Sequence, residues 1–168
     1  MGSGCDREDG SQPKPEVPTI KEIAVYKKIL VPTDGSETGG KVVAPAVALA
    51  QSCGATVVAL HVTDPYPYSG LAETVPITAD QYRVHVTKVA EDALKPLQDA
   101  CAAAKVTCER VIGEDIHPWK AMLDVAKDRG CDLVVIASHG RRGVQALLLG
   151  SETQKLLTHS TIPVLVLR

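Results

Sequence analysis

A glycine-rich run over residues 137–151 has the residue types and spacing to bind phosphate. It begins A-S-H-G-R-R-G and ends in Gly150 and Ser151. Glycine lets the backbone turn tightly and lets a ligand approach it closely. Gly150 and Ser151 open an expected helix, whose first N–H groups and positive dipole end attract anions. Arg141 and Arg142 could add contacts to phosphate oxygens.

Each part of this run also has a purely structural reading. Ser151, with Gln154 three residues later, fits a capping box, so its hydroxyl could serve only as an N-cap. The arginines could be solvated loop charges, and the glycines could be turn formers. The run, however, follows the most apolar expected strand, 132–137. Ligands of open parallel sheets sit at the carboxyl ends of such strands, so this order favours anion binding.

A second glycine run, residues 35–41, nearly matches the phosphate loop G-x-x-x-x-G-K-[ST]. Val42 stands where that motif needs a hydroxyl for magnesium, and Glu37 would place a carboxylate in the phosphate cradle. No expected strand ends in the acidic residue that such enzymes use for the metal. The run therefore predicts a capped helix start, not a phosphate loop.

Asp34 lies just beyond the carboxyl end of the first expected strand, and it has two readings. With Glu37 three residues later, it fits the Asp variant of a capping box. Alternatively, its carboxylate lies at the same sheet edge as the 137–151 run and bonds a sugar hydroxyl or a base amine. The two roles are compatible only if different oxygens serve them.

The elements that must position these residues alternate along the chain. Short β-branched runs are separated by longer stretches with helical spacing, which predicts βαβ units and a parallel sheet. The expected strands are Lys28–Val31, Ala55–Val62, Val106–Ile112, Asp132–Ala137 and Ile162–Leu167.

Further signals mark the helix ends. Thr78 with Gln81 fits a capping box, and Gly54 and Gly130 stand where helices should stop. Pro45 and Pro96 fall inside helical patterns and predict that the first two helices kink or start later. Asp115 precedes an expected apolar helix face, and the irregular, proline-rich segment 63–77 could act as a lid. That face consists of Ile116, Trp119, Leu123 and Ala126.

Composition sets the class of the protein. The chain has 168 residues, of which 45% are hydrophobic, a net charge of −2 and no Phe. This predicts one aliphatic-cored domain over residues 26–168, after a disordered tail over 1–25. No membrane span, signal peptide or nucleic-acid footprint is expected, which favours a cytoplasmic protein. The five scattered cysteines and five histidines show no metal-ligand spacing. The cysteines are expected to be reduced and most of them to fill the core, with a redox role for one of them as the alternative.

Several motifs, in this order and spacing, resemble the universal stress protein family over nearly all of residues 26–168. They are K-K-I-L-V-P-T-D-G-S-E from Lys27, L-H-V from Leu60, A-S-H-G-R-R-G from Ala137, L-L-L-G-S from Leu147 and I-P-V-L-V-L from Ile162. The resemblance implies a Rossmann-like α/β fold related to the adenine nucleotide α-hydrolases, an open five-stranded parallel sheet in the order 3-2-1-4-5 with helices on both faces. It also implies a homodimer formed through the last strand, Pro163–Leu167.

One branch of that family binds ATP or AMP through the pattern G-x2-G-x9-G-[ST]. This chain supplies Gly140, Gly150 and Ser151 but has Ala137 at the first position, which puts affinity and the preferred number of phosphates in question. By resemblance, further residues border the nucleotide, and Mg²⁺ could accompany ATP. Pro32, Thr33 and Asp34 would border the adenosine, the Val62 backbone would bond the adenine, and Gly140, Gly150, Ser151 and Glu152 would hold ribose and phosphates.

Three functions compete at this point. The first is a nucleotide-binding stress-response module, and the second is a dimeric interaction protein of the same fold that binds no nucleotide. The third is an enzyme, a slow ATPase or a relative of the α-hydrolases. His139 is the only histidine in the loop, and the S-G-G-x-D-S signature of the α-hydrolases is absent. No catalytic residue is therefore assigned, and slow hydrolysis is the most that is expected.

Overall fold

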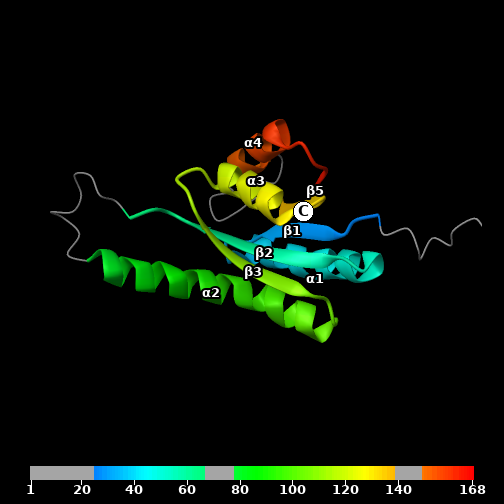
Figure 1. The fold of residues 1–168 in the computed structure, drawn as a ribbon, viewed down its shortest axis with the longest axis horizontal. Coiled ribbons are helices and arrows are strands. Elements are labelled where there is room, and N and C mark those ends of the chain that lie inside the picture. Colours follow the sequence, from blue (N-terminus) through cyan, green and yellow to red (C-terminus); the bar gives the residue numbers. More distant parts are fainter. Residues whose placement is uncertain (1–24, 67–77, 139–148) are drawn as a thin grey trace, which may run out of the picture.

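The computed structural model describes residues 25–66, 78–138 and 149–168, and these form one five-stranded sheet with four helices (Figure 1). Residues 1–24 of the predicted tail lie outside the described residues, as does most of the segment expected to act as a lid. In chain order the elements are β1 Lys28–Pro32, α1 Glu37–Cys53, β2 Thr56–Thr63, α2 Ala79–Ala103, β3 Cys108–Glu114, α3 Pro118–Arg129, β4 Leu133–Ala137, α4 Ser151–His159 and β5 Val164–Leu167.

The sheet is parallel throughout, as the sequence pattern predicts, and its strand order, β3-β2-β1-β4-β5, is the one that the family resemblance implies. β1 pairs on one side with β2 and on the other with β4, with Ile29 opposite both Val57 and Leu133. The chain therefore winds outward from β1 in both directions. The winding direction changes between β1 and β4, and ligands of open parallel sheets bind at the carboxyl ends of the strands at such points.

Two apolar layers cover the sheet. On one face, Ile29 and Val135 pack with α1 and α2, and on the other, Leu30 and Val134 pack with α3 and α4. Figure 1 shows α3 and α4 on one side of the sheet and α2 on the other. The core is aliphatic, because strands buried on both faces are built from Val, Ile and Leu. No helix among the described residues has the length and apolar character to cross a bilayer.

The helix ends confirm some of the sequence signals. Gly54 and Gly130 end α1 and α3 in the left-handed conformation, with φ of 64° and 66°. Of the two alternatives predicted for Pro45 and Pro96, the later helix start is wrong, because α1 and α2 begin well before these prolines and run through them. A kink at each proline stays a prediction. α3 begins only at Pro118, so Ile116 precedes the helix and is exposed instead of forming part of its apolar face.

The capping box at the start of α2 is confirmed and gives a testable contribution to stability. The Gln81 N–H donates to the Thr78 hydroxyl (3.2 Å), and the Gln81 side chain accepts from the Thr78 N–H (3.0 Å). We expect Thr78→Ala to lower the free energy of unfolding by about 1 kcal/mol, measured by urea denaturation. Ser52→Ala is the matched control, because both contacts of the exposed Ser52 hydroxyl, to the Leu49 carbonyl and to Cys53 Sγ, lie within its own helix. Equal losses in both variants would contradict the capping role.

Candidate functional site

Two hydrogen bonds join the carboxyl end of β1 to the second half of β2. The Thr33 N–H donates to the Leu60 carbonyl at 2.9 Å. The buried His61 ring bonds the Thr33 carbonyl through Nδ1 at 2.8 Å. A carbonyl oxygen can only accept, so Nδ1 carries the proton in this bond. These contacts hold the loop that carries Asp34, and the sequence analysis gave His61 no such role.

Within that loop, Asp34 is not the helix cap that one of its two readings proposed. Its Oδ1 accepts a hydrogen bond from the Ser36 N–H at 2.9 Å, and Gly35 turns the backbone through the left-handed region with φ of 74°. Ser36 is the N-cap of α1, and its hydroxyl accepts from the Gly39 N–H at 3.1 Å. The 35–41 run is thus a capped helix start, as predicted, but the cap lies two residues later than Asp34.

Gly39 is a residue of this loop that sequence reasoning missed. It is buried in the first turn of α1, and a Cβ built on it would lie 3.0 Å from Asp34 Oδ1 and 3.4 Å from Thr33 Oγ1. The absence of a side chain therefore allows α1 to pack directly against the Asp34 carboxylate. A Cβ on the neighbouring Gly40 would meet nothing within 4 Å.

Two hydrogen bonds join the start of α4 to the end of β4. The Gly150 N–H donates to the Ser138 carbonyl at 2.8 Å, and the buried Thr153 hydroxyl donates to the Ala137 carbonyl at 3.1 Å. Gly150, not Ser151, is the N-cap, and no side chain among the described residues caps this helix. The predicted Ser151–Gln154 capping box is therefore wrong. Ser151 is instead the exposed first residue of α4, so capping does not use its hydroxyl.

The uncapped end of α4 has the properties of an anion site. Helical geometry gives the first N–H groups no carbonyl within the helix, here those of Ser151, Glu152 and Thr153. They carry the positive end of the helix dipole. This end follows β4, and Asp34 follows β1, the neighbouring strand. The topology thus brings the carboxylate and the helix end to the same edge of the sheet.

The Glu152 side chain has a structural role that the sequence did not indicate. Its Oε2 accepts from the Trp119 backbone N–H at 3.1 Å, and its Oε1 pairs with the Lys155 ammonium at 3.1 Å. α3 has no side-chain cap of its own. Glu152 therefore caps α3 from α4. The Trp119 ring also stacks on His159, with ring centroids 4.6 Å apart.

The other predicted residues lie along the same edge or outside the described residues. Pro32 ends β1 and is buried, and Ala137 ends β4 at 8% exposure. Val62 lies near the end of β2, with Gly113 of β3 as its backbone partner. Gly140, His139, Arg141 and Arg142 lie outside the described residues. Among those described, no group of three or more His, Cys, Asp or Glu side chains could hold a metal ion.

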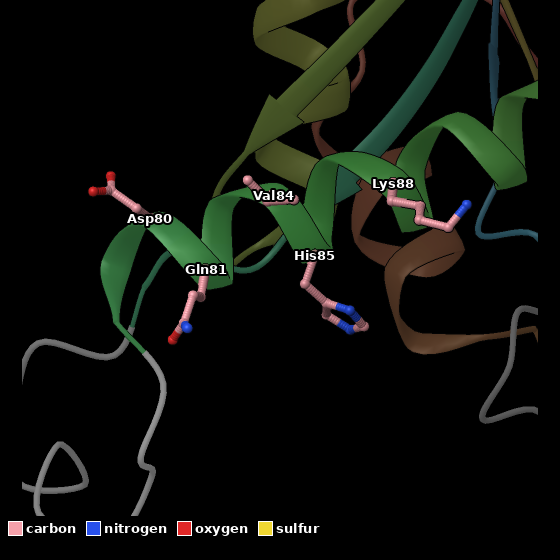
Figure 2. Close-up of a pocket in the computed structure, with 5 residues that line it drawn as sticks. All are labelled: Asp80, Gln81, Val84, His85 and Lys88. Atoms are coloured by element: carbon pink, nitrogen blue, oxygen red, sulfur yellow. The ribbon is translucent and has the colours of Figure 1, made fainter.

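A separate open hollow lies along α2, and none of the predicted site residues lines it (Figure 2). Its five side chains do not converge: Asp80 points away from the helix on one side, whereas Gln81 and His85 point to another (Figure 2). Small-molecule sites are concave, with polar groups that converge on the ligand. This hollow is wide open to solvent and its side chains do not converge, so the edge of the sheet remains the candidate site.

Comparisons with known proteins show the family and the fold of the chain. Residues 25–168 match the model of the Universal stress protein family. Universal stress protein YxiE of Bacillus subtilis is 30% identical over 86% of this chain and 100% of its own. The solved structure of hypothetical protein MJ0577 superposes with a TM-score of 0.72 at 28% identity, over 84% of this chain and 95% of that one.

Two more distant structures share the fold and carry nucleotides. One is a universal stress protein in complex with cAMP, with a TM-score of 0.61 at 21% identity, which covers 85% of this chain and 97% of that one. The other is the universal stress protein from Archaeoglobus fulgidus in complex with dAMP, with a TM-score of 0.60 at 18% identity, over 86% and 99% of the two chains.

Proposed function

Since this chain belongs to the universal stress protein family, we propose that it binds an adenine nucleotide, ATP or AMP, and acts as a regulatory module of the stress response. The observation that carries the proposal is the uncapped N-terminus of α4 at the same sheet edge as Asp34. The nucleotides bound by two proteins of the same fold support the ligand class. Any hydrolysis of ATP by the module is slow. The module works in the cytoplasm.

In the proposed complex, the two halves of the nucleotide meet different strands. Pro32, Thr33 and Asp34 border the adenosine, and the backbone of Val62 bonds the adenine ring. The N–H groups of Ser151 and Glu152, together with Gly140, hold the ribose and the phosphates. Glu152 serves through its backbone, because both oxygens of its side chain already accept hydrogen bonds from α3 and Lys155. Mg²⁺ is held by the phosphates of ATP and not by metal-ligating side chains of the protein.

Calorimetric titration of the full chain with ATP and Mg²⁺, and separately with AMP, tests the proposal. Saturable binding supports it, and no heat of binding at millimolar nucleotide would overturn it. The proposal also predicts how the number of phosphates affects affinity. Ala137 adds a methyl group where the family pattern has glycine, and this methyl group restricts how closely phosphates approach the backbone. AMP, with one phosphate, should therefore lose less affinity than ATP.

Ser151→Ala tests how much the N-terminus of α4 contributes to nucleotide binding. Since the Ser151 hydroxyl does not cap α4, its removal should weaken ATP binding by about three- to tenfold, the value of one hydrogen bond. The melting temperature should stay the same. Thr158→Ala is the control, because the Thr158 hydroxyl donates to Gln154 within the same helix at 2.9 Å. Equal affinity of both variants would show that Ser151 does not touch the nucleotide.

One observation favours a second candidate, a homodimeric interaction protein that binds no nucleotide. β5 is an edge strand with Leu165 40% exposed, and an apolar edge can pair with a second copy of the chain. We propose the homodimer through Pro163–Leu167 under either function. The candidates differ in the titration: sedimentation that shows a dimer, with no heat on ATP addition, supports the second.

A further inference from the structure

The backbone ladder between β1 and β2 stops before the end of β2. On the β1 side, the Leu60 carbonyl accepts from the Thr33 N–H at 2.9 Å. On the β3 side, the Thr63 carbonyl accepts from the Asp115 N–H at 3.2 Å. The backbone groups of successive residues face opposite neighbours, so those of Val62 face β1, and in a continued parallel ladder its N–H would donate to the Thr33 carbonyl. The described part of the chain has no such bond.

The side chain of His61 bonds the Thr33 carbonyl in place of Val62. Side chains alternate along a strand, so His61 lies on the same face of the sheet as Ala59, which packs in the core with α1 and α2. From that face, His61 Nδ1 donates to the Thr33 carbonyl at 2.8 Å, and His61 itself is only 6% exposed. The Thr33 carbonyl is thus hydrogen-bonded from one face of the sheet and not from within the ladder.

This arrangement leaves the Val62 N–H available at the sheet edge of the candidate site. Val62 is half-buried near the carboxyl end of β2, and its backbone faces the strand that leads to Asp34. Backbone N–H groups away from bulk water are nearly always hydrogen-bonded in folded proteins, so a ligand that brings an acceptor to this place gains a bond. Adenine has ring nitrogens that accept hydrogen bonds.

We propose that His61 is a positioning residue of the nucleotide site: its ring holds the Thr33 carbonyl out of the ladder, so that the Val62 N–H is presented to the adenine ring. This inference rests on the proposed function, and it adds a buried residue that does not itself touch the nucleotide. Without the donor on His61, the Thr33 carbonyl and the Val62 N–H are left to pair with each other. The ladder then extends by one bond, and the base loses its donor.

Amide hydrogen exchange of the ¹⁵N-labelled full chain, followed by NMR, tests the state of the Val62 N–H directly. In wild type, saturating ATP should slow its exchange by about tenfold or more, the effect of one new hydrogen bond. In His61→Leu, its exchange should already be slow without nucleotide, because the Val62 N–H then donates to Thr33. A substitution that merely loosens the fold would speed this exchange instead. Faster exchange of the Val62 N–H in His61→Leu than in wild type would overturn the proposal.

Calorimetry with matched variants of the full chain measures the effect on binding. His61→Leu should weaken ATP binding by about tenfold or more, whereas His61→Asn, which keeps an N–H donor near the position of Nδ1, should stay within about threefold of wild type. Inorganic tripolyphosphate, which has no base, should bind His61→Leu and wild type equally. His85→Leu is the control, because the exposed His85 lies on α2 and lines none of the candidate site.

The outcomes separate this inference from the proposed function. If wild type binds neither ATP nor AMP, the proposed function is wrong and the role of His61 falls with it. If wild type binds ATP and His61→Leu binds it equally tightly, the proposed function stands and the role of His61 is wrong. Should His61→Leu fail to fold, the exchange of the Val62 N–H in wild type decides: slowing by ATP supports the proposal, and unchanged exchange overturns it.

Discussion

Gly39→Ala is expected to weaken ATP binding by at least about tenfold, whereas Gly40→Ala leaves it unchanged. A Cβ at position 39 would lie 3.0 Å from Asp34 Oδ1 and 3.4 Å from both Thr33 Oγ1 and Ser36 Oγ. The Asp34 loop must therefore move away from α1 by some tenths of an ångström. Asp34 is the residue proposed to bond the adenosine, and a loss of about 1.4 kcal/mol from a misplaced hydrogen bond corresponds to tenfold in affinity.

The neighbouring glycine supplies the control for this prediction. Both residues lie in the first turn of α1, and both substitutions add one methyl group. Alanine in place of a helical glycine stabilises by about 0.5–1 kcal/mol, which Gly40→Ala should show in full because its Cβ meets nothing within 4 Å. Gly39→Ala should gain less or lose stability. Calorimetry and urea denaturation measure both effects, and wild-type affinity in Gly39→Ala would remove Asp34 from the proposed site.

The fold could be predicted from the sequence because its signals are local. The apolar run of β4 and the alternation of strand and helix patterns need no knowledge of distant residues. The expected strands end within two residues of the observed ones, and the capping box of α2 and both glycine helix ends are confirmed. The order of the strands came from the family resemblance, and the structure confirms it.

The details of the site could not be predicted so well, because they depend on turns and on contacts across the sheet. The sequence analysis considered only Asp34 as a cap for α1, whereas the left-handed turn at Gly35 in the folded loop makes Ser36 the cap. The start of α4 is decided by the bond from Gly150 to Ser138, across a segment of the chain that no local pattern spans. The contact of Gly39 with Asp34 requires the folded loop, so the sequence offered only two adjacent glycines.

Glu152→Ala is expected to lower the free energy of unfolding by about 2 kcal/mol, the value of a hydrogen bond to a charged group. The substitution removes the acceptor for the Trp119 N–H in the first turn of α3, which has no side-chain cap of its own. It also removes a carboxylate from the positive end of that helix. Urea denaturation followed by fluorescence measures the loss, since Trp119 is the only tryptophan of the chain.

Two further variants separate the cap from the charge. Glu152→Gln keeps a carbonyl oxygen that can accept from the Trp119 N–H, so it should recover more than half of the loss. Lys155→Ala removes only the exposed ion pair with Glu152, at 3.1 Å, and should cost less than about 0.5 kcal/mol. If Lys155→Ala were as destabilising as Glu152→Ala, the ion pair within α4 and not the cap on α3 would account for the loss. Because Glu152 directly follows Ser151, the cap also ties the proposed phosphate site to α3, and ATP should change Trp119 fluorescence in wild type but less in Glu152→Ala.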